Sequence, residues 1–325
     1  MKKINWGVLG TAGIAQGQTI PGMKQAENCE LYAVAGRFAA KAESFRERFG
    51  FQKAYGSCEE LLLDPDVEAV YIPLPNHLHF EWTKKALMHG KHVLCEKPLT
   101  PTAKEAEELF RTADEHHVVL MEAFAYLHSP FIAAVKDEID RGVIGELRYI
   151  ESQFLTSDYK LSNIRMRQET KGGCLYDLGC YPTSMIQWMS GKTPETVKAI
   201  AEFSPEGVDI LTAASFTYDG GLKAFMNCGM VLETEANRRL DQLRIEGSLG
   251  SIRSTAEFNG CGDLSYTVTK DNCTETKHVE APHNYKLEVE QLGRCILNGE
   301  KPHVSREFTI SNLRTMERII DKIRL

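Results

Sequence analysis

Short apolar runs alternate with mixed polar and apolar runs over roughly the first 120 residues of the chain. The apolar runs are typical of strands buried on both faces, and the runs between them are rich in Ala, Glu, Lys and Arg. The predicted strands cover residues 4–9, 31–35, 67–72, 92–95 and 118–121, and the predicted helices cover 14–23, 39–49, 59–63, 79–89 and 102–116. This alternation indicates βαβ units and a doubly wound parallel sheet.

The remainder of the chain has a different rhythm. A helix over 130–141 and a strand over 146–155 lead into a polar loop, which ends at Gly172-Gly173 before a helix over 175–189. Strands then follow one another without crossover helices, which indicates an antiparallel sheet. They are predicted at 196–203, 209–218, 222–232, 242–247, 251–257 and 263–269, with Gly220-Gly221 as a hairpin turn and closing helices over 285–297 and 309–323.

The change near residue 123 from alternating strands and helices to mostly consecutive strands predicts two domains. Residues 1–123 would form an α/β domain around the parallel sheet, and residues 124–325 an α+β domain with a large, mostly antiparallel open sheet. The length of 325 residues agrees with this division, since a domain averages about 150 residues.

Composition and charge exclude several classes of protein. The chain has 38 Lys and Arg against 45 Asp and Glu, and 42% of its residues are hydrophobic, which is ordinary for a globular protein. The net charge of −7 without a basic tail argues against nucleic-acid binding. No uncharged apolar run of about 18 residues exists, so we expect no membrane contact. A small-molecule partner is the remaining expectation.

The cysteines and the start of the chain bear on location. Nine cysteines are scattered without a C-x-x-C pair, and no export signal is clear at the start. Such thiols fit a reducing compartment, so we expect a cytoplasmic protein with packing cysteines. No H-E-x-x-H and no carboxylate cluster with metal spacing is present, so no metal site is predicted.

Candidate chemistry begins where the first strand meets the first helix. The segment Gly10-Thr11-Ala12-Gly13-Ile14 matches a G-x-G-x-x-G turn with alanine at the middle glycine. In such a turn, backbone N–H groups and a helix N-terminus bind a pyrophosphate. A purely structural turn is the alternative interpretation.

The end of the second strand bears on which dinucleotide would bind. NAD sites commonly place Asp or Glu about 20 residues after the glycines, and residues 34–37 contain no acid. Arg37 offers paired donors for a 2′-phosphate, so NADP(H) is the preferred cofactor and NAD(H) remains possible. The alternative is that Arg37 is only a solvated residue at a helix start.

The third and fourth strands end in further polar motifs. Pro75-Asn76-His77-Leu78-His79 follows one, and Glu96-Lys97-Pro98 follows the other. Open α/β sheets bind ligands at the carboxyl ends of their strands. Pro98 restricts the backbone of Lys97, and we hypothesise a cis bond between the two.

Five motifs stand out along the chain, at residues 10–15, 75–79, 96–98, 121–124 and 172–182. Together they resemble the glucose–fructose oxidoreductase, inositol dehydrogenase and rhizopine-catabolism (Gfo/Idh/MocA) superfamily, over essentially the whole chain. Within it the chain looks most similar to the dihydrodiol dehydrogenase, xylose dehydrogenase and anhydrofructose reductase branch. The resemblance implies a Rossmann domain, NAD(P)-dependent redox chemistry on a sugar, polyol or related carbonyl, and a homodimer or homotetramer formed through the second sheet.

The resemblance also implies which residues form the site. Lys97, Asp177 and Tyr181 would be catalytic. Pro75, Asn76, His79, Glu96 and Lys97 would join the glycine turn and Arg37 around the cofactor. Phe124 and Arg165 would contact substrate together with Lys97, Asp177 and Tyr181. Arg165 is equally open to a solvated position or a contact with cofactor phosphate.

Asp177 and Tyr181 are spaced i, i+4, which places both on one face of an α-helix. Tyr181 stands where the inositol dehydrogenase pattern has histidine. A tyrosine with a free pKa near 10 suits proton donation to a forming alkoxide beside a lysine cation, so carbonyl reduction is slightly favoured. A tyrosine packed against the sheet is the alternative.

Two other functions stay open at this point. One is a glycoside-cleaving enzyme of the same superfamily that uses bound NAD⁺ for transient oxidation. The other is a non-catalytic dinucleotide sensor, although a sensor has no need of Lys97, Asp177 and Tyr181. The sequence does not specify the substrate or the physiological direction of the reaction.

Overall fold

The computed structural model describes residues 2–233 and 238–323, which form two compact units. The first unit is Met1–His128 with Pro282–Ile310, and the second is Ser129–Ala281 with Ser311–Leu325. The sequence interpretation assigned everything after residue 123 to one domain. The structure differs, because the segment Pro282–Ile310 returns to the first unit.

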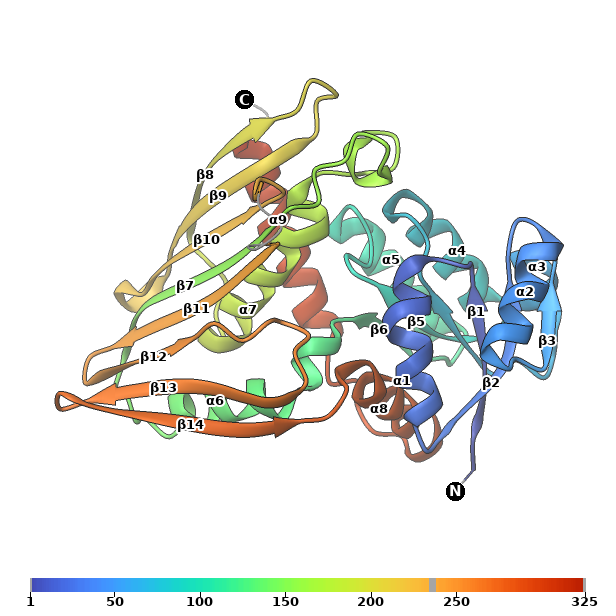
Figure 1. The fold of residues 1–325 in the computed structure, drawn as a ribbon, viewed down its shortest axis with the longest axis horizontal. Coiled ribbons are helices and arrows are strands. Elements are labelled where there is room, and N and C mark those ends of the chain that lie inside the picture. The colour runs from blue at the N-terminus through green and yellow to red at the C-terminus, as the bar shows by residue number, and fades with distance from the viewer. Residues whose placement is uncertain (1, 234–237, 324–325) are drawn as a thin grey trace. The chain divides into compact units, whose positions relative to one another are not determined.

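A parallel sheet forms the centre of the first unit, in the order β3-β2-β1-β4-β5-β6 (Figure 1). All neighbouring strands in it are parallel, which confirms the predicted doubly wound α/β fold. The strands are β1 Ile4–Leu9, β2 Cys29–Ala35, β3 Lys53–Tyr55, β4 Ala69–Ile72, β5 His92–Glu96 and β6 Leu120–Ala123. The sequence pattern did not predict β3, a three-residue edge strand whose side chains are all half-buried.

The helices of the first unit lie between these strands in sequence. They are α1 Ile20–Gln25, α2 Ala39–Phe49, α3 Cys58–Leu63, α4 Asn76–Met88, α5 Ala103–Glu115 and the late helix α8 Asn284–Asn298. A π-helical turn, Ala15–Thr19, precedes α1. The predicted start of α4 at residue 79 was wrong by three residues, since the helix begins at Asn76 directly after Pro75.

Close contact between α1 and α8 explains why the late segment belongs to the first unit. A β-carbon on Gly22 would lie 2.7 Å from the backbone nitrogen of Lys286 and 2.8 Å from the carbonyl carbon of Tyr285. Asn28 donates a hydrogen bond to the carbonyl of Glu290 at 2.9 Å. Nothing in the local pattern of residues 282–310 signals this long-range packing.

The second unit is built on a sheet in the order β14-β13-β12-β11-β7-β10-β9-β8. Its pairs are antiparallel except β7 with β10, so the prediction of a mostly antiparallel sheet is confirmed. Its strands are β7 Leu147–Thr156, β8 Thr196–Phe203, β9 Asp209–Thr217, β10 Lys223–Gly229, β11 Arg239–Gly247, β12 Gly250–Ser254, β13 Gly262–Lys270 and β14 Cys273–Ala281. The mostly polar strand β14 was not predicted.

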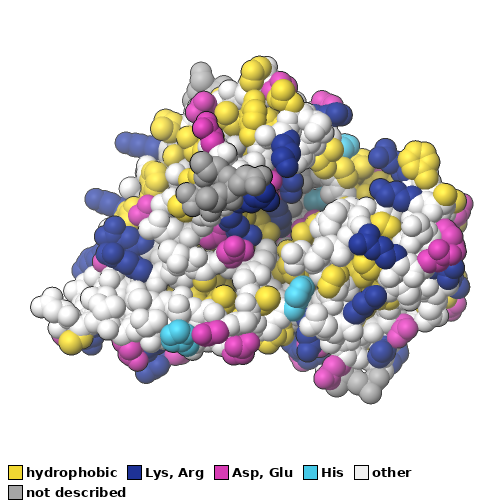
Figure 2. Space-filling model, viewed as in Figure 1, with side chains coloured by type: hydrophobic (Ala, Val, Ile, Leu, Met, Phe, Trp, Pro, Cys, Tyr) yellow, Lys and Arg dark blue, Asp and Glu magenta, His cyan; other side chains and the backbone are white. Residues whose placement is uncertain are grey.

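Helices cover one face of this sheet. Helix α6 (Pro130–Asp140) and helix α7 (Cys180–Ser190) lie on the same side (Figure 1), and α9 (Arg306–Ile323) ends the described chain. Along β7 the side chains alternate, with Ile150, Ser152 and Phe154 buried and the intervening residues half-buried. The other face therefore carries half-buried and exposed side chains. Figure 2 shows hydrophobic side chains among charged ones over the β8–β9 end, where Ile200 and Phe203 are exposed.

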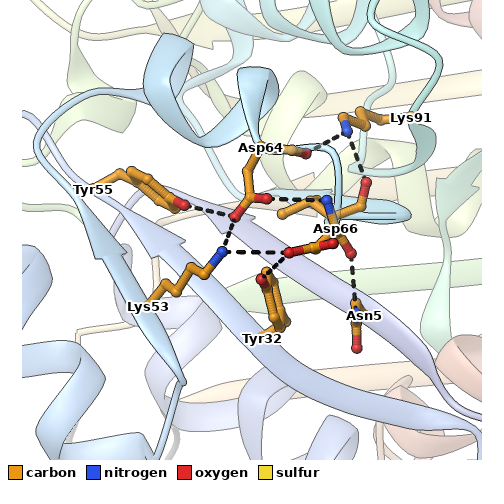
Figure 3. Close-up of polar contacts among 8 residues, drawn as sticks. Asn5, Tyr32, Lys53, Tyr55, Asp64, Asp66 and Lys91 are labelled. Atoms are coloured by element: carbon orange, nitrogen blue, oxygen red, sulfur yellow. Dashed lines mark hydrogen bonds and ion pairs between the residues drawn. The ribbon is translucent and has the colours of Figure 1, made fainter.

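A polar network anchors the turn between α3 and β4 in the first unit (Figure 3). The carboxylate of Asp64 accepts hydrogen bonds from Tyr55 at 2.6 Å and from Lys53 at 2.9 Å. Tyr32 donates to Asp66 at 2.9 Å, and Lys91 donates to the carbonyl of Asp64 at 2.7 Å. Burial works against the charged form of Asp64, but these donors outweigh it and lower its pKa. The network is internally paired and therefore structural.

No helix within the described residues is long and apolar enough to cross a membrane.

Candidate functional site

The predicted glycine turn lies at the end of β1. Gly10 has a φ of +117°, which a residue with a side chain rarely adopts, and its N–H donates to the carbonyl of Ala35 at 2.9 Å. A β-carbon on Gly13 would meet no atom within 4 Å, and Gly13 and Ile14 are exposed. The backbone over Thr11 and Ala12 is half-buried. This geometry leaves one side of the turn open to a phosphate group.

Arg37 follows β2 at the same edge of the sheet. Its side chain is exposed, and no residue in the described chain pairs with it. A β-carbon on the preceding Gly36 would lie 3.5 Å from Cγ2 of Thr11, so the start of Arg37 is close to the glycine turn. An exposed guanidinium near the glycine turn fits a dinucleotide that carries an additional phosphate.

Pro75 and Asn76 begin helix α4 after β4, and both are half-buried. His79 lies one turn further on and is 1% exposed. Its Nδ1 lies 2.8 Å from the carbonyl oxygen of Pro98, and its Nε2 lies 2.7 Å from that of Leu74. The ring therefore connects the loop after β4 to the loop after β5. Burial lowers the pKa of His79, although the two carbonyls oppose that shift.

The loop that carries Lys97 is held on both sides of that residue. Before it, the hydroxyl of Tyr71 donates to Oε1 of Glu96 at 2.5 Å, and Thr19 donates to the Tyr71 oxygen at 2.8 Å. The Lys97–Pro98 peptide bond is cis, as hypothesised. Lys97 itself is half-buried while its neighbours Glu96 and Pro98 are buried. The residues on either side of Lys97 are therefore buried, and hydrogen bonds hold the side chain of Glu96 in place.

Beyond Lys97, the N–H of Leu99 donates to Oε1 of Glu122 at 2.8 Å. Glu122 is fully buried at the second position before the predicted substrate contact Phe124. Burial raises the pKa of Glu122 to about 7, although hydrogen bonds from Leu99 and Thr309 and the charge of Lys97 favour the charged form. Lys97 therefore has a carboxyl group within electrostatic reach whose protonation changes near neutrality.

A second buried carboxyl lies near Glu96. Glu288 on α8 is fully buried, and neither of its oxygens has a hydrogen-bond partner among the described residues. Burial raises the pKa of Glu288 well above its ordinary value, and the neighbouring Glu96 raises it further. Sequence reasoning did not find Glu288, because a glutamate in a predicted amphipathic helix reads as a solvated residue.

Phe124 lies in the core of the first unit. Its ring is 0% exposed and meets Tyr126 at 6.0 Å and Phe308 at 6.4 Å, both nearly edge to face. This is the environment of a packing residue. The surroundings of Phe124 give the expected substrate contact no support.

The motif around Gly172-Gly173 starts a helical segment in the second unit. A β-carbon on Gly173, whose φ is +108°, would lie 2.0 Å from Oδ1 of Asp209. The other carboxyl oxygen of Asp209 accepts the N–H of Leu175 at 2.7 Å and thereby holds the first turn. Residues Leu175–Gly179 form a π-helical turn before α7, and such turns are frequent at functional sites.

Asp177 lies in this π-helical turn and pairs with Arg165. Arg165 Nε is 2.6 Å from Oδ2 of Asp177. The charge of Asp177 raises the pKa of Arg165, burial opposes the shift, and Tyr181 contributes in the same direction as Asp177. Three of the predicted site residues, Arg165, Asp177 and Tyr181, are therefore electrostatically connected.

Tyr181, on the first turn of α7, is 8% exposed. Its ring meets Phe154 at 5.3 Å and Phe258 at 5.2 Å. The side-chain amide of Asn259 donates to the Tyr181 hydroxyl oxygen at 3.3 Å. The aromatic rings hold the phenol ring in place, and the amide contacts its oxygen.

Arg239 completes the surroundings of Tyr181. Its guanidinium lies over the ring of Phe154 at 4.5 Å and forms two hydrogen bonds with Asp241, at 2.8 and 2.6 Å. Burial opposes the charge of Arg239, but the contacts with Asp241 outweigh it and raise its pKa. Sequence reasoning missed Arg239, Asn259 and both phenylalanines. The predicted strand began at residue 242, and Asn259 lies in a turn that carries no motif.

No group of three or more His, Cys, Asp and Glu side chains converges within the described residues in the way a metal ion requires.

Known proteins resemble the chain over almost its full length. A D-xylose 1-dehydrogenase (NADP⁺) from Haloferax volcanii is 34% identical over 326 residues, covering 97% of this chain and 96% of that protein. A trans-1,2-dihydrobenzene-1,2-diol dehydrogenase from Xenopus tropicalis is 29% identical over 309 residues, covering 91% and 90%. The crystal structure of KijD10, a 3-ketoreductase from Actinomadura kijaniata in complex with NADP and TDP-benzene, superposes with a TM-score of 0.92 at 30% identity, covering 99% and 98%.

The fold and the matched sequence define an NAD(P)-binding oxidoreductase. Residues 4–124 match the oxidoreductase family with an NAD-binding Rossmann fold, and residues 132–253 match the GFO/IDH/MocA C-terminal domain. The chain belongs to the GFO/IDH/MocA oxidoreductase family, which confirms the resemblance inferred from the five motifs.

Proposed function

We propose that this protein is an NADP(H)-dependent oxidoreductase that interconverts a carbonyl group and an alcohol on a sugar, a polyol or a related molecule. The observation that carries this proposal is that hydrogen bonds hold the loop containing Lys97 in a defined position. His79 and Glu122 contact the backbone of Pro98 and Leu99, and Tyr71 donates a hydrogen bond to the side chain of Glu96. A lysine held in this way suits a defined task, such as polarising a reacting oxygen.

The glycine turn and Arg37 form the proposed cofactor site. The open side of the turn at Gly13 accepts the pyrophosphate, and the exposed guanidinium of Arg37 binds the 2′-phosphate. Pro75, Asn76 and the Glu96–Lys97 loop complete the site. NADP(H) is preferred and NAD(H) possible, and the NADP named for the xylose dehydrogenase and the 3-ketoreductase supports this choice.

The bound cofactor would supply or accept the hydride, and the protein would manage the oxygen and its proton. Lys97 donates a hydrogen bond to the carbonyl oxygen and stabilises the negative charge that develops there. Tyr181 donates the proton in reduction and accepts it in oxidation. Asp177 and Arg165, paired at 2.6 Å, orient substrate hydroxyls as one acceptor and donor unit.

His79 and Phe124 take different roles in this proposal from those expected at first. Both ring nitrogens of His79 already face backbone carbonyls, so the residue positions the two cofactor loops instead of contacting the cofactor. Phe124, buried among aromatic rings, is a packing residue in the core of the first unit.

Activity with a panel of carbonyl compounds and alcohols tests the proposal. Aldoses, polyols, diketones and nucleotide-linked ketosugars are offered with NADPH or NADP⁺, and absorbance of the reduced cofactor is followed. We expect turnover with at least one hydroxylated substrate and a loss of about 100-fold or more in kcat for Lys97→Met and for Tyr181→Phe. Lys160→Met, a change in the polar loop of the second unit, serves as the control.

Turnover that is unchanged in Lys97→Met would refute the role of the lysine. Release of aglycone from a glycoside without added nucleotide would instead favour the alternative function, a glycoside-cleaving enzyme that uses bound NAD⁺ for transient oxidation. Tight NADPH binding without any turnover would favour a sensor.

The proposal extends to assembly and location. The open face of the eight-stranded sheet, with Leu240 41% exposed, would pair with a second copy in a homodimer or homotetramer. Nine free thiols support a reducing, cytoplasmic setting. Light scattering tests the assembly. Leu240→Glu should lower the mass to that of a monomer, whereas Leu63→Glu, on an exposed residue of the first unit, should leave the mass unchanged.

A further inference from the structure

Asn259 lies between β12 and β13, with its side-chain amide against the phenol of Tyr181. The N–H of the amide donates to the Tyr181 oxygen at 3.3 Å, the one hydrogen bond that this side chain makes within the described chain. Its own carbonyl oxygen is buried and has no partner among the same residues. A buried amide oxygen without a partner destabilises the folded protein. A contribution to stability therefore does not explain why an asparagine occupies this position.

The packing around Tyr181 fixes the phenol ring but not the direction in which its hydroxyl hydrogen points. Phe154 and Phe258 lie against the ring at 5.3 and 5.2 Å and fix its orientation. The hydroxyl hydrogen can still rotate about the C–O bond. Because the N–H of Asn259 occupies a lone pair of the oxygen, the hydroxyl hydrogen is directed away from the amide and is left to donate elsewhere.

The surroundings also favour negative charge on the Tyr181 oxygen. Arg165 and Arg239 both interact electrostatically with Tyr181. An N–H donor makes a stronger hydrogen bond to a phenolate than to a neutral phenol. The amide and the two guanidinium groups therefore act in the same direction.

We infer that Asn259 is a positioning residue that prepares Tyr181 as the proton donor of carbonyl reduction. The inference rests on the proposed function. In the step itself, the hydride that the bound nicotinamide cofactor would supply reaches the carbonyl carbon, the O–H bond of Tyr181 breaks, and its proton moves to the substrate oxygen to form the alcohol O–H. The phenolate left behind keeps the hydrogen bond from Asn259 until solvent returns a proton. The substrate class that fits this step is a carbonyl compound reduced to an alcohol.

Titration of Tyr181 tests the coupling without any substrate. The absorbance at 295 nm of wild type minus that of Tyr181→Phe isolates the ionisation of this phenol from that of the other tyrosines. The same difference is then taken in an Asn259→Leu background. We expect the midpoint to move to higher pH by about half a unit to one unit, because the donor to the phenolate is lost. An unchanged midpoint would overturn the inference.

Two further variants define the cause of the shift. Asn259→Asp has nearly the same shape but replaces the donor with an acceptor, so the midpoint should rise at least as far as in Asn259→Leu. Asn227→Leu removes another amide of the second unit whose oxygen also has no partner among the described residues. It should leave the midpoint of Tyr181 where it is. A shift in Asn227→Leu equal to that in Asn259→Leu would show a general effect on the unit and overturn the inference.

Activity separates this inference from the proposed function. With NADPH and 2,3-butanedione or the best substrate of the panel, Asn259→Leu should lower kcat about tenfold, with little change in KM. In a Tyr181→Phe background the same change should have almost no further effect, because Asn259 acts through that hydroxyl. Additive losses would overturn the inference. Full activity of Tyr181→Phe would instead refute the catalytic role of the tyrosine, while the titration still decides on the coupling.

Discussion

The hydroxyl of Thr309 donates a hydrogen bond to Oε2 of Glu122 at 2.8 Å, joining residues 187 positions apart in the chain. The other oxygen of Glu122 holds the N–H of Leu99, two residues after Lys97. The late segment of the first unit therefore supports the loop that carries the candidate catalytic lysine. A buried carboxyl group with two donors makes that support dependent on pH.

Glu122→Gln should change how stability depends on pH. Burial raises the pKa of Glu122 to about 7 from the ordinary 4.5, so the folded protein keeps a proton that the unfolded chain releases between these values. The stability conferred by this group is complete below pH 4.5 and is lost as pH rises through 7. We expect the free energy of unfolding of Glu122→Gln, relative to wild type, to rise by about 2 kcal/mol from pH 5 to pH 8.

Urea unfolding at several pH values measures this difference. The control is Glu115→Gln, a change of an exposed glutamate near the end of α5, which should follow the wild-type profile. Parallel profiles for wild type and Glu122→Gln would contradict the prediction.

His79→Leu should weaken cofactor binding more than it weakens the fold. The variant loses the ring that lies within hydrogen-bond distance of both the Leu74 and the Pro98 carbonyls, so the two loops are no longer connected. We expect the dissociation constant for NADPH, measured by fluorescence titration, to increase about tenfold. His89→Leu removes an exposed histidine that also contacts a backbone carbonyl, at the end of the same helix. Its NADPH affinity should equal that of wild type, and a similar loss in both variants would refute the role given to His79.

Arg37→Ala should discriminate between the two dinucleotides. If the guanidinium binds the 2′-phosphate, affinity for NADPH should fall about 10- to 100-fold while affinity for NADH changes less than about twofold. Lys41→Ala removes another exposed cation four residues further on and should affect neither nucleotide. Equal losses for NADPH and NADH in Arg37→Ala would contradict the assignment.

The parallel sheet was predictable because its strands are buried on both faces and therefore form uninterrupted apolar runs. Predicted residues 4–9 coincide with β1 Ile4–Leu9. Strand β14 was missed for the opposite reason. It is an edge strand with mostly exposed, polar side chains, and its pairing with β13 depends on tertiary structure. The return of Pro282–Ile310 to the first unit depends on tertiary packing in the same way.

In the candidate site, too, the sequence predicts residues that belong to local patterns and misses those that depend on tertiary contacts. Lys97 and Asp177 belong to local motifs, so the sequence predicts them directly. The contacts that hold the site in position do not follow from such motifs. Glu122 contacts Leu99 from the adjacent strand β6, and Asn259 contacts Tyr181 from a turn 78 residues away. Long-range contacts of this kind leave no spacing in the sequence that could signal them. The i, i+4 argument for Asp177 and Tyr181 also assumed an α-helix, whereas the first turn is π-helical.

Gly22→Ala tests whether the contact between α1 and α8 holds the late segment in place. The new methyl group would lie less than 3 Å from backbone atoms of Tyr285 and Lys286, which cannot move without shifting α8. We expect a loss of about 2–4 kcal/mol in unfolding free energy and faster proteolysis within residues 282–310. Gly17→Ala, where the added carbon meets nothing within 4 Å, should be neutral or stabilising by up to about 1 kcal/mol. Equal stability of the two variants would mean that α8 adjusts freely. The hydrogen bonds from Asn28 to Glu290 and from Thr309 to Glu122 would then hold the late segment in place without help from α1.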